Sequence, residues 1–284
     1  MTAQEGKRES TREGTRESKL DAIDTTVAQP ARRYNYWLGG KDNFAVDRES
    51  GDIIAKTFPT IRLAAIENRR FLQRATRYLA AEAGIRQFLD IGTGLPTADN
   101  THEVAQRIAP ESRVVYVDND PMVMMHAQAL LTSTPEGRTA YIEGDLREPG
   151  SILDRPQLRD TIDLSRPVGL MLVAVLHFIH GEGVAEAVVG ALLDELAPGS
   201  FLVASNATKD FATPMGETVY QAMVASGKLD MWLRTRDEFT RVFDGLELVD
   251  PGVVVCSEWR ADDEPQPRPE PAEVSVYGGV ARKP

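Results

Sequence analysis

The stretch Phe88–Asn100, FLDIGTGLPTADN, decides the fold of this chain. An apolar run passes through Gly92 and Gly94 into a polar turn, which is the pattern of a buried strand that ends at a ligand. Glycines at these positions let a backbone approach a bound molecule closely. A dinucleotide-binding loop carries a third glycine, and this chain has Thr97 at that position. The loop therefore predicts a nucleoside-like ligand and disfavours a dinucleotide.

Apolar, strand-like runs continue on both sides of this stretch and alternate with helical patterns. The predicted strands cover residues 86–91, 112–118, 139–145, 167–176 and 200–206. Apolar strands separated by helices form a parallel sheet covered on both faces. Two later runs, 246–256 and 273–281, are joined by a loop and predict an antiparallel hairpin that closes the sheet edge. We therefore expect an α/β fold with a doubly wound, mostly parallel, Rossmann-like sheet of about seven strands.

Three regions are predicted along the chain. Residues 1–20 are polar and carry charges of both signs, so we expect a disordered tail. Residues 21–84 show helical patterns and are expected to form a helical N-terminal segment and lid, packed over the sheet. Residues 85–284 hold all of the predicted strands and are expected to form the Rossmann-like domain.

Composition and charge exclude several classes of protein. The net charge of the 284 residues is −11, which opposes nucleic acid as a partner, because such binding depends on Lys and Arg that neutralise phosphates. A single cysteine, Cys256, excludes an internal disulfide and indicates a reducing compartment. The longest apolar run, 168–176, is far shorter than the ~20 residues that span a bilayer. With no signal-peptide pattern in the first residues, we expect a cytoplasmic protein without a membrane segment.

Aspartates stand at the ends of three successive predicted strands. Asp90 lies just before the first glycine, where a carboxylate would repel phosphate and could pair with an amine. Asp118 ends the next strand and can accept hydrogen bonds from both ribose hydroxyls, and Asp145 follows the third strand, where it could receive an adenine amino group. Any one of them could instead form a turn or cap a helix. Together they predict S-adenosylmethionine, which combines adenosine, a sulfonium and a zwitterionic amino acid.

The motifs DIGTG, VDNDP and EGD resemble the successive motifs of class I S-adenosylmethionine-dependent methyltransferases. More specifically, four stretches resemble an actinobacterial S-adenosyl methyltransferase family formerly catalogued as a domain of unknown function. These stretches are residues 31–48, 67–79, 88–97 and 116–123. The resemblance covers nearly all of the chain from about residue 21 onward, and it leaves the physiological substrate open.

The resemblance also implies a set of cofactor-binding residues. Asp90, Gly92 and Gly94 would line the amino-acid end of the cofactor. The ribose and adenine would meet four residues further along the chain, which are Asp118, Asn119, Asp145 and Leu146.

The motif YNYWLGGKDN, within residues 31–48, has two interpretations. The first is a lid, in which Tyr34 and Tyr36 cover the sulfonium by cation–π attraction and the paired glycines form a hinge. In the lid, Lys41 and Asn43 would contact the carboxylate of the cofactor. The second interpretation is a capped helix followed by a turn. Further on, Arg69 and three other arginines at helical spacing predict a solvated helix face.

Two histidines, His177 and His180, follow the fourth predicted strand, on the side where methyltransferases present groups to the acceptor. His177 is the candidate general base, although a histidine packed at a strand end would show the same pattern. We expect no metal site, because the other histidines, His102 and His126, lie on separate segments and no cysteine assists.

These patterns favour an enzyme that transfers a methyl group to a small molecule, with a secondary metabolite as a candidate acceptor. Two alternatives stay open. The chain could bind S-adenosylmethionine only as a sensor or interaction module, or it could be an NAD-dependent oxidoreductase, which Thr97 disfavours. The sequence leaves the acceptor, the methylated atom and the oligomeric state undetermined.

Overall fold

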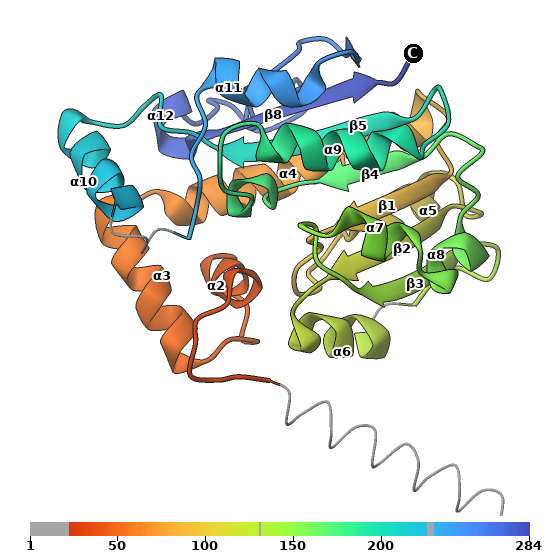
Figure 1. Cartoon of the computed structure of the whole chain (residues 1–284), viewed down its shortest axis with the longest axis horizontal. Coiled ribbons are helices and arrows are strands. Elements are labelled where there is room, and N and C mark those ends of the chain that lie inside the picture. Colours follow the sequence, from red (N-terminus) through yellow and green to blue (C-terminus); the bar gives the residue numbers. More distant parts are fainter. Residues whose placement is uncertain (1–22, 131, 226–229) are drawn as a thin grey trace, which may run out of the picture.

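The computed structural model describes residues 23–130, 132–225 and 230–284, so the predicted tail at 1–20 lies outside the described residues (Figure 1). Eight strands form one sheet in the order β3-β2-β1-β4-β5-β8-β6, with β7 also paired to β8. The strands are β1 (Gln87–Ile91), β2 (Arg113–Asp118), β3 (Arg138–Glu143), β4 (Gly169–Leu172), β5 (Phe201–Ala207), β6 (Glu247–Leu248), β7 (Val254–Val255) and β8 (Val276–Arg282). Strands β1 to β5 are parallel, and the strand order reverses between β1 and β4, which confirms the doubly wound α/β prediction.

The C-terminal strands differ in detail from the predicted hairpin. The run 246–256 forms two short strands, β6 and β7, and both pair antiparallel with β8 as expected. Strand β8 lies inside the sheet, antiparallel to β5, while the exposed β6 forms the edge. Five of the seven residues of β8 are buried, which suits an inner strand. A side chain at Gly278 would crowd Cys256 and Phe71, so this glycine lets a helix pack closely on β8.

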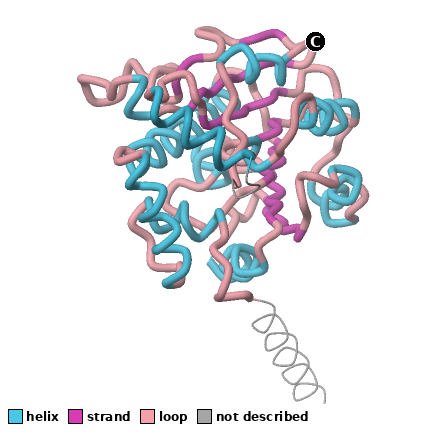
Figure 2. The backbone as a smooth tube through the Cα atoms, turned by 60° about the vertical axis from the view of Figure 1, so that its left-hand side comes forward, coloured by secondary structure: helices cyan, strands magenta, loops and turns pink. Residues whose placement is uncertain are grey.

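Helices cover both faces of the sheet (Figure 2). They are α2 (Pro30–Trp37), α3 (Ala45–Thr57), α4 (Ile61–Ala81), α5 (Thr101–Ile108), α6 (Pro121–Leu130), α7 (Pro149–Leu153), α8 (Pro156–Thr161), α9 (Val184–Asp194), α10 (Pro214–Ala225), α11 (Arg236–Thr240) and α12 (Pro271–Val274), with 3₁₀ turns η1 (Leu176–Phe178) and η2 (Arg241–Phe243). Helices α4 and α9 lie on opposite faces (Figure 1). None of the helices within the described ranges has the length and apolar character needed to cross a membrane.

The helices before β1 attach to the sheet in two different ways. Helix α4 carries Phe71, Ala75 and Leu79 into the main hydrophobic core. Helix α2 and the residues after it contact a smaller cluster, where Ala31 and Phe44 pack on apolar side chains of α6 and the glycine loop. The boundary expected near residue 84, between a helical segment and the sheet domain, stays a prediction.

Candidate functional site

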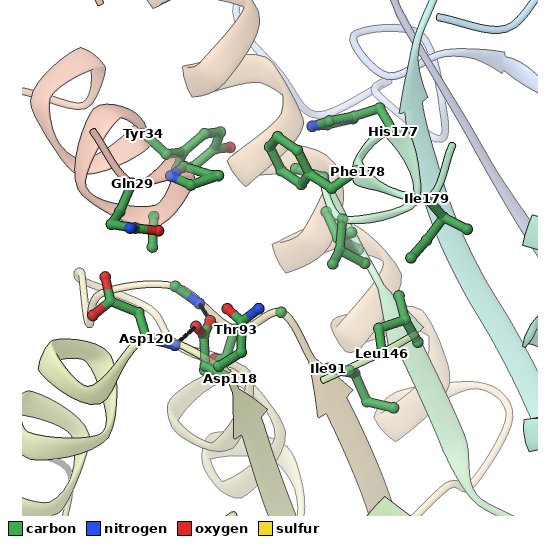
Figure 3. A pocket seen from close by; sticks show the side chains of 18 of the residues that line it. Gln29, Tyr34, Ile91, Thr93, Asp118, Asp120, Leu146, His177, Phe178 and Ile179 are labelled. Carbon is green, nitrogen blue, oxygen red and sulfur yellow. Dashed lines mark hydrogen bonds between the residues drawn. The ribbon is translucent and has the colours of Figure 1, made fainter. Parts of the chain in front are cut away.

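A cavity of about 610 Å³ opens at the carboxyl ends of β1, β2 and β4, beside α2 (Figure 3). Its volume is in the range of small-molecule sites, and its place is the switch point where open α/β sheets bind ligands. Segments far apart in the sequence line it: α2, α4, the ends of the first strands, η1, and Asp230 with Met231.

The glycine loop after β1 forms the floor of the cavity. Gly92 and Gly94 have φ values of +73° and +68°, a backbone region that favours glycine. A side chain on Gly92 would overlap Val175, which also lines the cavity. Thr97 belongs to the next turn, where its N–H donates to Asn100 Oδ1 at 3.2 Å. Asn100 caps α5, so the position of the missing third glycine is part of a helix cap.

Two buried carboxylates lie at the ends of neighbouring strands. Thr101 Oγ1 donates to Asp90 Oδ2 at 2.6 Å, and burial raises the pKa of Asp90 to about 6. Asp118 accepts from the Gly94 N–H at 2.8 Å and from the Asp120 N–H at 2.9 Å. Burial outweighs these hydrogen bonds and raises the pKa of Asp118 to about 6. The structure therefore brings Asp90, Asp118 and both glycines together as predicted from the sequence.

The third predicted carboxylate lies nearer the rim of the cavity. Asp145 is paired with Arg147, whose Nε donates to Asp145 Oδ1 at 2.9 Å, and this pairing lowers the pKa of Asp145 to about 2. Asn119 Nδ2 donates to Asp145 Oδ2 at 3.3 Å. Leu146 is buried and lines the same wall. All of these predicted residues lie at the cavity.

The predicted lid residues divide into two groups. Tyr34 lines the cavity, donates from its hydroxyl to Ala65 O at 2.9 Å and accepts from Asn68 Nδ2 at 2.9 Å. Burial raises the pKa of Tyr34 to about 12, so the phenol is neutral. Tyr36, Lys41 and Asn43 do not line the cavity, in contrast to the prediction.

The helical period of α2 explains the position of Tyr36. Arg33, Tyr34 and Trp37 share one face of α2 that points at the cavity, and Tyr36 lies beside that face. The Tyr36 hydroxyl donates to Asp52 Oδ1 at 2.9 Å, and the Arg62 guanidinium lies 4.7 Å from the ring centroid.

The turn formed by the GGKDN motif explains why Lys41 and Asn43 lie outside the cavity lining. Asn35 Oδ1 accepts from the Asp42 N–H at 3.1 Å and from Asn43 Nδ2 at 3.0 Å. A side chain on Gly40 would overlap Asn35, so the turn wraps closely around that amide. Lys41 is exposed on the turn. This segment therefore forms the helix end and turn of the second interpretation.

Turn η1 supplies the other end of the cavity. Like Tyr34, His177 and Phe178 lie on the side of the cavity opposite Asp118 (Figure 3). Burial lowers the pKa of His177 to about 3, so its imidazole is neutral at physiological pH. Its Nδ1 is buried and, within the described part of the chain, has no hydrogen-bond partner. Arg33 of α2 pairs with Asp230 at this end.

A buried arginine holds η1 in place. Arg234 donates to Leu176 O at 3.0 Å and to Ile179 O at 2.8 Å, on either side of His177. It also donates to Asn206 Oδ1 at 2.9 Å. The carbonyls that flank His177 are therefore fixed by a residue that reaches them from another segment.

Several residues of the cavity were not expected there from the sequence, among them Arg33, Asn68, Arg69 and Asp230. The sequence could have indicated Asn68 and Arg69, because both lie one helical turn before Leu72, on the apolar side of α4. The expected solvated face of arginines is wrong for Arg69, which lines the cavity, and for Arg74, which is buried and bonded to Trp259 O at 2.8 Å. Among the described residues, no group of three or more His, Cys, Asp or Glu could hold a metal ion.

Comparisons with known proteins identify what this chain is similar to. A family model described as S-adenosyl methyltransferase matches residues 16–284. A solved structure of a DUF574 family protein from Streptomyces avermitilis is 48% identical, with 92% of this chain and 100% of that chain covered and a TM-score of 0.85. A second, from Thermobifida fusca, is 44% identical, with 92% and 97% covered and a TM-score of 0.82. No curated protein sequence matches.

Proposed function

Because this chain belongs to the S-adenosyl methyltransferase family and is an S-adenosylmethionine-dependent methyltransferase, we propose that its cavity is where a small-molecule acceptor receives the methyl group. The observation that carries the proposal is the pairing, within one cavity, of two buried carboxylates at strand ends with a neutral histidine opposite them. Family membership agrees with the cofactor expected from the sequence and decides against the oxidoreductase alternative.

The residues of the cavity floor fit S-adenosylmethionine. Gly92 lines the cavity at a position where a side chain would overlap Val175, and Asp90 offers a carboxylate to the ammonium group. Asp118 offers acceptors to the ribose hydroxyls, while Asn119, Asp145 and Leu146 would edge the adenine. This acidic set suits a cofactor with a positive charge and no phosphate.

The opposite end of the cavity would hold the acceptor. Tyr34 and Phe178 present aromatic rings, His177 presents a neutral imidazole, and Arg33 is neutralised by Asp230. The cavity volume suits a small molecule, and the net charge of −11 disfavours nucleic acid.

Bound S-adenosylmethionine supplies an electrophilic methyl group. The protein has to align the acceptor, exclude water and remove a proton where the acceptor is a hydroxyl. We assign the proton removal to His177 Nε2. A neutral imidazole can accept this proton, because a hydroxyl becomes strongly acidic as its oxygen bonds to a second carbon. The low pKa also means that His177 is unprotonated and ready at every physiological pH.

Helix α2 would cover the bound cofactor. The predicted role as a lid is thus kept for the residues of α2 that face the cavity. Arg32 is almost fully buried and forms a two-point ion pair with Asp120, at 2.8 Å and 2.9 Å. Asp120 lies two residues after Asp118, so the pair joins the cover to the loop that would bind the ribose.

The experiment that tests this function is release of S-adenosylhomocysteine in the presence of fractionated cell extract, followed by mass spectrometry of the molecule that gains a methyl group. Methylation of a small molecule supports the proposal. Cofactor binding without turnover in any fraction would favour the sensor alternative, and methylation of nucleic acid or protein would contradict the assigned class of acceptor.

A further inference from the structure

Arg69 differs from the other arginines of the cavity. Three arginines line it within the described residues, Arg33, Arg69 and Arg147. Arg33 is paired with Asp230, and Arg147 is paired with Asp145. Arg69 forms no ion pair with any carboxylate of the described ranges. Its positive charge is therefore available to an anionic group of a ligand.

The guanidinium of Arg69 is also fixed in position. Its Nη2 lies within hydrogen-bond distance of three oxygens of the loop after the glycines, Ala98 O at 3.3 Å, Asp99 O at 3.1 Å and Asn100 Oδ1 at 3.0 Å. Its Nε is buried and has no partner in the described part of the chain. A charged group that the fold already holds loses little conformational freedom when a ligand binds.

Arg69 lies near the buried carboxylate at the end of β1. Both residues line the same cavity, and the positive charge of Arg69 acts to lower the pKa of Asp90. This part of the cavity therefore presents one buried carboxylate and one unpaired guanidinium. A zwitterionic amino acid carries the complementary charges, with an ammonium for Asp90 and a carboxylate for Arg69.

We propose that Arg69 is the residue that binds the carboxylate of the methionyl part of the cofactor. The inference rests on the proposed placement of the cofactor over Asp90 and Asp118. It gives to Arg69 the role that the sequence suggested for Lys41 and Asn43, both of which lie outside the cavity lining. Arg69 thereby makes the site selective for nucleosides that carry an intact amino acid.

Two probes separate this role from a structural one. S-adenosylhomocysteine carries the amino acid, and 5′-methylthioadenosine has the same nucleoside and sulfur without it. Calorimetry measures both affinities for the wild-type chain, for Arg69→Gln and Arg69→Ala, and for Arg77→Ala as the control. The glutamine substitution removes the charge and keeps a shorter polar side chain, and Arg77 is an exposed arginine of the same helix.

We expect Arg69→Gln to weaken S-adenosylhomocysteine binding about 10- to 100-fold, the usual range for a lost charge-assisted hydrogen bond, and to leave methylthioadenosine binding within about twofold. The control should bind both probes as the wild type does. Equal losses for both probes would reduce Arg69 to a loop anchor and overturn the proposal, as would unchanged binding of S-adenosylhomocysteine. A wild-type chain that binds neither probe would instead contradict the proposed placement of the cofactor.

Discussion

The two ends of the cavity are built in different ways. At the cofactor end, Asp90, Gly92 and Asp118 each follow or end a strand, and the parallel pairing of β1 with β2 brings them together. At the acceptor end, the contacts join distant segments: Arg234 reaches Leu176 across 58 residues, and Arg33 reaches Asp230 across 197. The first end follows from regular secondary structure, whereas the second depends on individual side chains that meet only in the folded chain.

The two ends also differ in electrostatics. Buried carboxylates dominate the cofactor end, and burial raises the pKa values of Asp90 and Asp118 to about 6. The acceptor end offers a neutral imidazole and an arginine already paired with a carboxylate. This contrast predicts that changes at one end alter cofactor affinity and that changes at the other alter turnover.

The largest expected effect is at the acceptor end. His177→Ala removes the proposed proton acceptor and should lower turnover by about 10²- to 10⁴-fold, with S-adenosylhomocysteine affinity changed by less than about twofold. Steady-state kinetics with the identified acceptor and calorimetry measure the two quantities. His126→Ala, at a half-buried histidine of α6 outside the cavity lining, is the control and should retain most of the activity. Normal turnover of the His177 variant would assign that residue a packing role.

Asp118→Asn should have the next largest effect, on binding alone. The amide keeps the shape of the side chain but loses the negative charge and one acceptor of hydrogen bonds, so S-adenosylhomocysteine affinity should fall about 10- to 100-fold. Turnover at saturating cofactor should change little. Asp99→Asn, at a partly exposed aspartate that pairs with Arg107 outside the cavity lining, is the control. A large loss of turnover with unchanged affinity would contradict the division between the two ends.

The pH dependence of cofactor binding should follow from the raised pKa values of Asp90 and Asp118. Both carboxylates must be ionised to meet the cofactor, so affinity should fall below about pH 6, by at most about tenfold per pH unit for each group. In the free protein the same shifts stabilise the fold as the pH drops from about 6 to about 4, because the folded state then binds more protons than the unfolded state. Calorimetry between pH 5 and 8 measures the affinity. Constant affinity over that range would contradict the proposed contacts of both carboxylates.

Hydrogen exchange at α2 should respond to ligand to a smaller degree. If α2 covers the bound cofactor, free S-adenosylhomocysteine at about five times its Kd should slow exchange of its backbone amides by up to about sixfold. Amides of α8, which lies outside the cavity lining, serve as the internal reference. Equal protection of α2 with and without ligand would make it a fixed wall of the cavity.

The smallest expected effect comes from Lys41→Ala. Lys41 is exposed on a turn outside the cavity lining, so S-adenosylhomocysteine affinity should stay within about twofold of the wild-type value. Calorimetry under the conditions used for the Asp118 variant makes the two results comparable. A tenfold loss would show that the turn at 39–43 reaches the cofactor after binding.

The sequence by itself determined the sheet and the edge of it at which the three aspartates lie. Alternation of apolar strands with helices requires a covered parallel sheet, and parallel strands place Asp90, Asp118 and Asp145 at one edge whatever the details of packing. Gly92 and Gly94, which have positive φ, could also be recognised from the sequence, because the need for glycine there depends on the local backbone alone.

Only the tertiary structure decided which side chains of the N-terminal helices face the cavity. Tyr34 and Tyr36 belong to one short motif, yet the rotation of α2 about its axis, set by the buried Arg32–Asp120 pair and the packing of Ala31, separates them. Arg69 and Arg77 share one helix, yet one lines the cavity and the other is exposed. Periodicity gives the spacing of residues on a helix, but the direction of each face is set by contacts with residues far away in the chain.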